Sequence, residues 1–561
     1  MRKVEYNAQF CVVGGGLSGL CAAISAARHG IKTVLMQDRP VLGGNASSEI
    51  RMWVCGAQGY RATGIIEELE LENFYQNPAH KFPIWDSVLY EKAILEPNIK
   101  LLLNCSCLDA EMDGNTIKSV TGWQSVSQTY YKINADYFAD CSGDSILAPL
   151  TGADFTYGRE AKAEFNETIP PDVADRKTMG MSCLMQLRET DHKTYFKAPS
   201  WAYKYEKPED FPGRVPKNIN DNFWWIETGG LKDCIYDTDE CRDELLKICY
   251  GVWDYMKNYS DIDADNWELE WIGFLPGKRE SNRYRGAYVI SQNDVEAGGK
   301  FDDVVAFAGW KMDDHFPEGF YYKGELSTIF HPAPSPWGIT YRSLYSRNIN
   351  NLYFAGRNIS VTHAALSSSR VMETCSLLGQ AVGAAVSVVI NENYTPQTVD
   401  IKRVQELLMQ DDCFLPGLNR NVSELTKKAH TNAEIVRNGI ERETQNCWIG
   451  NKGDYIEYSF DVPQTVQKIR IVFDSDLKRN YQNMPCNFKL NEPRFKLPET
   501  IIKEYSVVLT DENGNESVIA VDENHQRLVW HEVGKKLIKV RLVPNETWGC
   551  ETFNVFSFEL I

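Results

Sequence analysis

Residues 10–37 constrain the fold of this 561-residue chain more than any other stretch. An apolar run that starts at Phe10 leads into a glycine-rich turn, an alanine-rich helix that ends at Gly30, and a second apolar run, "KTVLMQ". Strand, helix and parallel strand within about thirty residues predict a βαβ unit of an α/β domain. The turn carries the pattern G-x-G-x-x-G in Gly14, Gly15, Gly16, Leu17, Ser18 and Gly19.

The glycines of this turn suit a pyrophosphate. Gly14 permits the tight turn, Gly16 lets the backbone approach the phosphates, and Gly19 allows the helix and the strand to pack closely. The pyrophosphate then lies against the positive end of the helix. A pattern of this kind is also found in simple tight turns, but between a strand and a helix it predicts a dinucleotide-binding site.

The end of the second strand departs from the usual pattern. Dinucleotide-binding proteins normally place an acidic residue there, which accepts hydrogen bonds from a ribose. This strand ends at Gln37, and Asp38 follows. A glutamine still offers a carbonyl acceptor, but it lacks the charge that would strengthen the bond by about 1 kcal/mol. We expect Gln37 to make the ribose contact. The alternatives are that Asp38 makes it or that Asp38 faces water.

Three later motifs resemble those of flavoproteins. A second glycine turn, Gly43-Gly44, follows the second strand. The stretch "YFADCSGD" resembles a strand-end motif that usually reads ATG, with Cys141-Ser142-Gly143 in its place. The stretches "NLYFAGRN" and "LLGQAVGAA" resemble a strand end and a helix aimed at the flavin. The dipole of such a helix stabilises negative charge on the reduced ring.

On these four motifs, spread over residues 8–390, the chain resembles the FAD-dependent oxidoreductases of the glutathione-reductase-like superfamily. It is most similar to bacterial oxidoreductases with a discontinuous FAD domain, distantly akin to fumarate reductase flavoproteins. The resemblance implies FAD as the cofactor and leaves the substrate open. The implied FAD contacts are Gly14, Gly16, Leu17, Ser18, Gly19, Gln37, Asp38, Gly43, Gly44, Asn45, Ser48, Cys107, Gly143, Gly356, Arg357, Arg370 and Val371.

Composition divides the chain into five parts. Residues 1–155 and 331–392 are predicted to form the two parts of a Rossmann-like α/β FAD-binding domain. Residues 156–330, rich in Trp, Tyr and Pro, are predicted to be an inserted α+β substrate domain. Residues 393–430 read as a helical connector, and 431–561 resemble a discoidin-like, galactose-binding-like all-β sandwich. That sandwich either binds a glycan or only covers the catalytic domain or an oligomer contact.

Charge and hydropathy limit the partners. A net charge of −18 argues against a nucleic-acid partner. The run "LLGQAVGAAVSVVI" is shorter than the ~18 to 20 residues of a membrane span, and the N-terminus shows no signal sequence. The 15 cysteines are scattered, without a disulfide framework or zinc spacing. We therefore expect a cytoplasmic protein with a small-molecule substrate, no nucleic acid, no membrane and no metal, and leave a homo-oligomer open.

Oxidation of a substrate C–H bond usually needs a base for the departing proton, most often a histidine or a carboxylate. His363, which precedes the flavin-facing helix, is the first candidate, and His331 in "IFHPAPSPWG" is the second. Arg51, shortly after the second glycine turn, is a third candidate for the catalytic site. Cys55 is a less favoured candidate for a redox partner, because single buried cysteines are usually inert.

The remaining motifs bear on the substrate. Lys278, Arg279, Arg283 and Arg285 lie close together and either hold a substrate carboxylate or line a solvated strand face. Tryptophans in and beside the insertion suit sugar rings, although buried tryptophans are commonly core residues. We predict an FAD-dependent oxidoreductase that transfers hydride from a C–H bond of a sugar, polyol or sugar acid to flavin N5. The alternative is a glycan-binding protein with an inactive flavin domain.

Overall fold

The computed structural model describes residues 1–219, 222–492 and 495–561. The chain forms two compact units. Unit 1 comprises Met1–Gln58, His80–Val404 and Gln482–Pro493. Unit 2 comprises Gly59–Ala79, Gln405–Tyr481 and Arg494–Ile561.

This division differs from the predicted boundaries at two segments. Residues 59–79, expected in the first part of the FAD domain, belong to unit 2, where Leu71 and Phe74 share a buried cluster with Leu497 and Ile501. The segment Gln482–Pro493, expected in the sandwich, belongs to unit 1. Its Asn487 side chain accepts a hydrogen bond from the Leu187 backbone N–H at 2.8 Å. Long-range packing of this kind leaves no trace in local composition.

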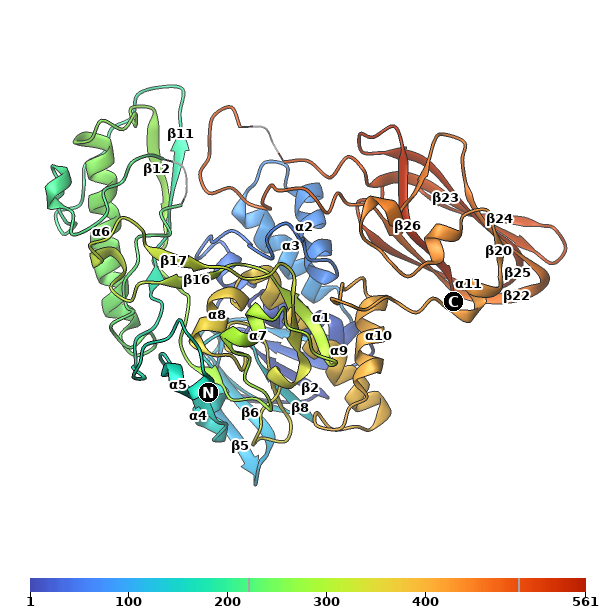
Figure 1. Ribbon diagram of the computed structural model, residues 1–561, viewed down its shortest axis with the longest axis horizontal. Coiled ribbons are helices and arrows are strands. Elements are labelled where there is room, and N and C mark those ends of the chain that lie inside the picture. The colour runs from blue at the N-terminus through green and yellow to red at the C-terminus, as the bar shows by residue number, and fades with distance from the viewer. Residues whose placement is uncertain (220–221, 493–494) are drawn as a thin grey trace. The chain divides into compact units, whose positions relative to one another are not determined.

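A parallel sheet of five strands forms the centre of unit 1, with the order β19-β8-β2-β3-β4 among the described residues (Figure 1). Every residue of β2 and β3 is buried, which is typical of a parallel sheet covered on both faces. Helix α1 connects β2 to β3, so the Rossmann-like βαβ unit is confirmed. The strands are β2 (Phe10–Val13), β3 (Thr33–Met36), β4 (Ile99–Leu102), β8 (Tyr137–Asp140) and β19 (Leu352–Phe354).

Two helices pack closely on each other beside this sheet: α1 (Leu17–Arg28) and α9 (Met372–Glu392). A Cβ atom on Gly379 of α9 would lie 1.9 Å from the Ser18 carbonyl oxygen of α1, so only glycine permits this approach. By length and composition α9 is able to cross a membrane, which corrects the expectation that no segment is long enough. The share of its most apolar window that is buried is 94%, so the helix is part of the unit's core.

A second sheet is formed by β1 and by three strands that lie between β4 and β8 in the sequence. Its order is β1-β7-β6-β5 among the described residues, and Cys105 and Cys107 lie at the start of β5. The strands are β1 (Arg2–Asn7), β5 (Cys105–Asp113), β6 (Thr116–Gln124) and β7 (Thr129–Asn134).

The inserted region of unit 1 consists of one long helix and short antiparallel strand pairs. Helix α6 (Thr238–Asn258) lies beside the pair β11 (Met185–Glu189) and β12 (Trp267–Ile272) and shares a buried cluster with it (Figure 1). Two more antiparallel pairs precede β19 in the sequence. They are β15 (Val304–Ala308) with β18 (Trp337–Thr340), and β16 (Met312–His315) with β17 (Thr328–His331).

Unit 2 is all-β in its C-terminal part. Seven strands of the described chain form one sheet, in which β20 pairs β22 beside the path β21-β26-β22-β25-β23-β24. Its buried face is a single apolar cluster that includes Ile469, Val507 and Leu542. The strands are β20 (His430–Thr431), β21 (Trp448–Gly450), β22 (Ile456–Phe473), β23 (Ile502–Asp511), β24 (Glu516–Val521), β25 (Leu528–Thr547) and β26 (Phe553–Leu560).

Candidate active site

A pocket of about 290 Å³, called the glycine-loop pocket below, lies at the carboxyl ends of β2, β3 and β8. The first residues of both α1 and α9 line it, so the positive ends of two helices face the same space. Ligands of open α/β sheets bind at this end of the strands. The sequence-predicted contacts that line the pocket are Gly14, Gly16, Leu17, Ser18, Gln37, Asp38, Gly43, Gly44, Asn45, Cys107, Gly143, Gly356, Arg357 and Arg370.

Three sequence-predicted contacts do not line this pocket. A Cβ on Gly19 would lie 1.8 Å from the Gly14 carbonyl oxygen, so Gly19 serves the packing of the loop on its helix. The Ser48 backbone N–H donates to the Asp86 carboxylate at 3.0 Å. Val371, just before α9, lines a second pocket, which is described below.

The glycine-loop pocket fits the pyrophosphate of a dinucleotide. Gly14 has a φ of +104°, and a Cβ there would lie 2.4 Å from the Cys141 backbone. Gly16 and Gly44 approach so closely that a Cβ on Gly44 would lie 3.1 Å from the Gly16 Cα. The two turns therefore leave a cradle without side chains, in which backbone N–H groups are able to approach phosphate oxygens.

Gln37 holds the glycine loop. Its side-chain oxygen accepts a hydrogen bond from the Gly15 N–H at 2.7 Å, and its amide donates to the Val41 carbonyl at 3.2 Å. Asp38 lines the same pocket, and its side chain is 58% exposed. Because one acceptor site of the Gln37 oxygen is already used, the geometry favours Asp38 as the ribose contact. This reverses the order expected from the sequence.

Asp140, at the end of β8, organises the turn that follows, and the sequence reasoning missed it. Its carboxylate accepts hydrogen bonds from the Ser142 N–H at 2.9 Å, the Leu147 N–H at 2.8 Å and the Tyr284 hydroxyl at 2.7 Å. Burial raises the pKa of Asp140. The sequence did contain a signal for this role, because Asp140 is an acidic residue directly before the Cys-Ser-Gly turn.

A second pocket of about 190 Å³ adjoins the first. We call it the tryptophan pocket, because Trp53, Trp224 and Trp310 line it together with Phe330. Its acidic and basic lining residues are Lys278, Arg279, Asp313, His315, Arg357 and Arg370. Residues that line both pockets are Asn45, Arg357, Arg370 and Met372. The two pockets are therefore neighbours in one site.

A chain of alternating basic and acidic side chains follows the wall of the tryptophan pocket. Asp313 Oδ2 lies 3.1 Å from both Arg370 Nη2 and His315 Nε2. On its other side, His315 Nδ1 lies 2.6 Å from Glu227 Oε2, which is 3.4 Å from Arg279 Nη1. Burial raises the pKa of Asp313 and of Glu227, but the adjacent basic side chains hold both below the ordinary value. Both carboxylates are therefore ionised, and His315 is held between them.

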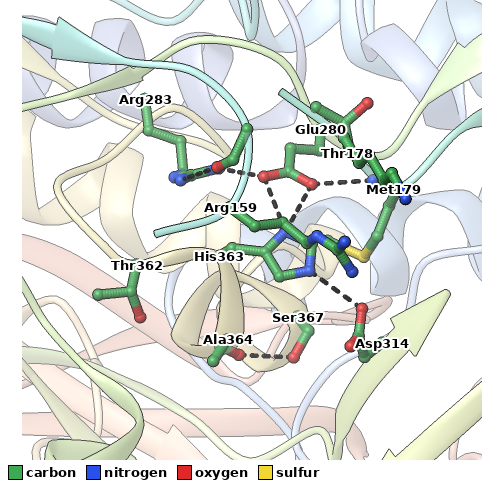
Figure 2. A network of polar contacts seen from close by, with 12 residues as sticks. Arg159, Thr178, Met179, Glu280, Arg283, Asp314, Thr362, His363, Ala364 and Ser367 are labelled. Atoms are coloured by element: carbon green, nitrogen blue, oxygen red, sulfur yellow. Dashed lines mark hydrogen bonds and ion pairs between the residues drawn. The ribbon is translucent and has the colours of Figure 1, made fainter. Parts of the chain in front are cut away.

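His363, the first candidate base, lies outside both pockets. It begins α8 (His363–Ser369) and lies between two carboxylates, with Nδ1 2.9 Å from Glu280 and Nε2 3.0 Å from Asp314 (Figure 2). Arg283 is bonded to the same Glu280. The side chain of His363 is 1% exposed.

The protonation state of His363 argues against a role as a base. Burial lowers the pKa of its imidazole, but the carboxylates of Glu280 and Asp314 outweigh this and raise it to about 10. At neutral pH the ring is an imidazolium whose two N–H groups are both used. It has no lone pair with which to accept a proton. The structure therefore corrects this assignment, and His363 is a buried ion-pair residue.

Strand β16 separates His363 from the pocket. Asp313 and His315 line the tryptophan pocket, while Asp314 between them bonds to His363. Successive side chains of a strand point to opposite faces, so one short strand serves both networks. His331 pairs with Met312 in the β16–β17 ladder and does not line the pocket, whereas its neighbour Phe330 does. The pocket geometry therefore does not support His331 as the second candidate base, which stays a prediction.

Arg51 lines neither pocket, so its assignment as a catalytic candidate stays a prediction without support from the pocket geometry. Its Nη1 donates to Gln186 at 3.0 Å, and its guanidinium lies 4.4 Å from the ring of Trp271 and 4.6 Å from that of Phe82. Cys55 does line the tryptophan pocket, but burial raises the pKa of its thiol to about 12. A protonated thiol is a poor nucleophile.

The family of the chain follows from a match over most of its length. The family model described as FAD dependent oxidoreductase matches residues 9–408, which include every residue of both pockets. The chain belongs to this family. It is an FAD-dependent oxidoreductase, and FAD is its cofactor. None of the curated proteins matches the chain.

Three solved structures resemble the chain at low sequence identity. The OxyS anhydrotetracycline hydroxylase from Streptomyces rimosus has 10% identity and a TM-score of 0.33, covering 72% of this chain and 67% of its own. A geranylgeranyl bacteriochlorophyll reductase-like protein from Thermoplasma acidophilum has 11% identity and a TM-score of 0.33, covering 72% and 84%. A fucose binding module from Streptococcus pneumoniae has 11% identity and a TM-score of 0.19, covering 25% of this chain and 98% of its own.

The Gly19→Ala variant tests the loop. We expect it to bind FAD about tenfold more weakly or worse, because the new Cβ would lie 1.8 Å from backbone. The measurement is the flavin absorbance of the purified protein and its recovery on titration with FAD. The control is Gly152→Ala, which strains a left-handed backbone but has no atom within 4 Å of the new Cβ. Equal FAD affinity in Gly19→Ala and wild type would contradict the packing role of Gly19.

Proposed function

We propose that this oxidoreductase oxidises a hydroxyl-bearing carbon of a sugar, polyol or sugar acid held in the tryptophan pocket. The observation that carries the proposal is that this pocket and the glycine-loop pocket share Asn45, Arg357, Arg370 and Met372. A ligand in the tryptophan pocket is thereby adjacent to the cofactor site, and it meets His315 there.

The residues of the glycine-loop pocket would hold the cofactor. The loop Gly14–Gly19 and the start of α1 suit the pyrophosphate, and Asp38 suits the ribose. When bound, FAD supplies a two-electron oxidant that accepts the hydrogen of a carbinol C–H bond together with its electron pair. Asp144 helps to shape the boundary with the tryptophan pocket, because its carboxylate lies 2.7 Å from Lys278 Nζ and 2.5 Å from Arg357 Nη2.

In this proposal His315 is the general base. As the C–H bond breaks, the substrate O–H proton passes to His315 Nε2, and the carbon–oxygen bond becomes a carbonyl. Glu227, 2.6 Å from Nδ1, keeps the proton of the ring on that nitrogen and stabilises the imidazolium that forms. Glu227 is itself held by the Gly180 N–H, which donates to its other oxygen at 2.7 Å. When the substrate binds, its hydroxyl replaces Asp313 as the partner of Nε2, and His315 enters the reaction as the neutral ring, with its one proton on Nδ1 toward Glu227.

The aromatic walls support a substrate with a sugar-like skeleton. Flat indole faces pack on the C–H faces of a sugar, and the polar residues between them bond its hydroxyls. The ring of Trp224 lies 5.6 Å from that of His315, so an aromatic surface borders the base directly. We propose that unit 2 is an accessory module, and that a small molecule rather than a nucleic acid is the partner of this acidic chain.

Anaerobic mixing of the FAD-loaded protein with a panel of sugars, polyols and sugar acids tests the proposal. We expect at least one member of the panel to bleach the flavin absorbance near 450 nm, with one flavin reduced per carbonyl formed. No bleaching by any member would rule out this substrate class. Protein that stayed colourless after reconstitution with FAD would instead favour the alternative, a glycan-binding protein with an inactive flavin domain.

A further inference from the structure

We infer that Arg370 binds the carboxylate group of the substrate in the tryptophan pocket, and that the substrate is a 2-hydroxy acid. Its hydroxyl faces His315 while its carboxylate faces the guanidinium. This inference rests on the proposed function, which it narrows to one substrate class.

The walls of the pocket carry an excess of positive charge. Four cationic side chains line it, but Asp313 is the one carboxylate among the described lining residues. Acidic residues behind the lining neutralise part of this charge. Lys278 and Arg357 share Asp144, and Arg279 lies 3.4 Å from Glu227. An anionic ligand is therefore favoured over a cationic one.

Two of these cations, Arg279 and Arg357, already donate hydrogen bonds to other residues of the protein. Arg279 Nη1 donates to the Ser182 hydroxyl at 3.0 Å, and its Nη2 donates to the Trp224 carbonyl at 2.8 Å. Arg357 donates to Asp144 and to the Ser281 hydroxyl at 2.6 Å. Each of them is therefore fixed in the wall by at least two protein acceptors.

Arg370 is different. Its hydrogen bonds to described residues all leave from Nη2, to the carbonyl and the carboxylate of Asp313 at 3.3 and 3.1 Å. Its Nε is buried and has no partner among the described residues. A guanidinium with spare N–H donors at the junction of the two pockets suits a carboxylate, which accepts several hydrogen bonds in one plane.

The separation of the two groups sets the spacing on the substrate. One oxygen of Asp313 lies 3.1 Å from both Arg370 Nη2 and His315 Nε2, so these nitrogens are at most two hydrogen-bond lengths apart. A carboxylate oxygen and a hydroxyl on the adjacent carbon are close enough to face both nitrogens together. A neutral polyol offers Arg370 only single hydroxyl acceptors, whereas a carboxylate offers two oxygens in one plane and a negative charge.

A ligand that binds but is not oxidised separates recognition from chemistry. 2-Hydroxyisobutyrate carries the carboxylate and the adjacent hydroxyl but has no C–H bond on the hydroxyl-bearing carbon. We expect it to bind the FAD-loaded protein at least about tenfold more tightly than its amide, as measured by calorimetry and by the shift in flavin absorbance. Equal affinity of the acid and the amide would overturn the inference.

Variants locate the site. Arg370→Gln is expected to remove the preference for the acid over the amide, while Arg370→Lys keeps part of it because a positive charge remains. The control Arg347→Gln changes an arginine that is 54% exposed and bonded to Asp154 outside both pockets, and it keeps the full preference. A preference that survives in a folded Arg370→Gln protein would overturn the inference. If that variant does not fold, the comparison of acid with amide on the wild type decides.

The inference and the proposed function fail in different ways. Tight binding of 2-hydroxyisobutyrate without flavin reduction by any secondary 2-hydroxy acid supports the carboxylate site and removes the proposed oxidation. Reduction by neutral polyols at the same rate as by 2-hydroxy acids keeps the oxidation and overturns the carboxylate site.

Discussion

Replacing His315 with asparagine is expected to lower the rate constant of flavin reduction by substrate about 10²- to 10⁴-fold, the usual contribution of a positioned general base. Asparagine keeps a polar side chain beside Glu227 and Asp313 but cannot take up the hydroxyl proton. Because the glycine-loop pocket does not include His315, FAD binding is expected to remain. Stopped-flow absorbance under anaerobic conditions measures the rate, and the flavin content of the purified variant reports the cofactor.

His331→Asn is the matched control, because His331 lies on the partner strand of the same β16–β17 pair but outside the pocket lining. It is expected to reduce flavin at the wild-type rate. A His315→Asn variant as fast as His331→Asn would remove His315 from the mechanism.

Replacing His363 with alanine is expected to lower the free energy of unfolding by about 3 to 5 kcal/mol, because it removes one partner from a buried ion-pair network. The carboxylates of Glu280 and Asp314, which flank the imidazolium, would lose a shared cation (Figure 2). Chemical or thermal unfolding of the FAD-loaded protein measures the effect. The control is His430→Ala, since His430 is 68% exposed and its change is expected to stay within about 0.5 kcal/mol.

The same network predicts how the effect of His363 depends on pH. Glu280 and Asp314 raise the folded-state pKa of His363 to about 10 against the effect of burial, whereas an unfolded histidine titrates near 6.5. A raised folded pKa gives stability that is complete below the unfolded pKa and is lost as pH rises through the folded one. The stability difference between wild type and His363→Ala should therefore shrink between about pH 6.5 and pH 10. A difference that grew over this range would contradict the ion-pair assignment.

A variant that kept its stability but lost flavin reduction would return His363 to the role of a base. The two histidines are thus distinguished by opposite outcomes. His315 is expected to affect the rate with little change in cofactor binding, and His363 is expected to affect stability first.

The cofactor site was largely predictable because its determinants are local. A tight turn needs Gly14, close packing of a strand on its helix needs Gly19, and both lie within a few residues of the strand end. Gln37 and Asp38 show the limit of this reasoning. The sequence predicts that either residue contacts the ribose. The hydrogen bond from the Gly15 N–H uses one acceptor site of Gln37 and so favours Asp38.

The chemistry beside the cofactor was not predictable from the sequence. His363 was chosen because it precedes a helix that begins at the cofactor, yet proximity along the chain does not determine where an imidazole points. Asp313, Asp314 and His315 are consecutive, and only the pairing of β16 with β17 decides which of them faces the pocket. No local pattern indicated that Glu227 would form a hydrogen bond with His315, which lies 88 positions away in the sequence.

The sequence by itself determined that this chain builds a βαβ dinucleotide site and binds FAD, because glycine positions and hydrophobic periodicity act over short distances. The tertiary structure decided which charged side chains border the cofactor and which are locked in ion pairs behind it. That choice depends on strand pairing and burial between segments far apart in the chain, which set both the direction of a side chain and its charge. As a result, Arg370 lines the tryptophan pocket, whereas the guanidinium of Arg51 packs on the rings of Phe82 and Trp271.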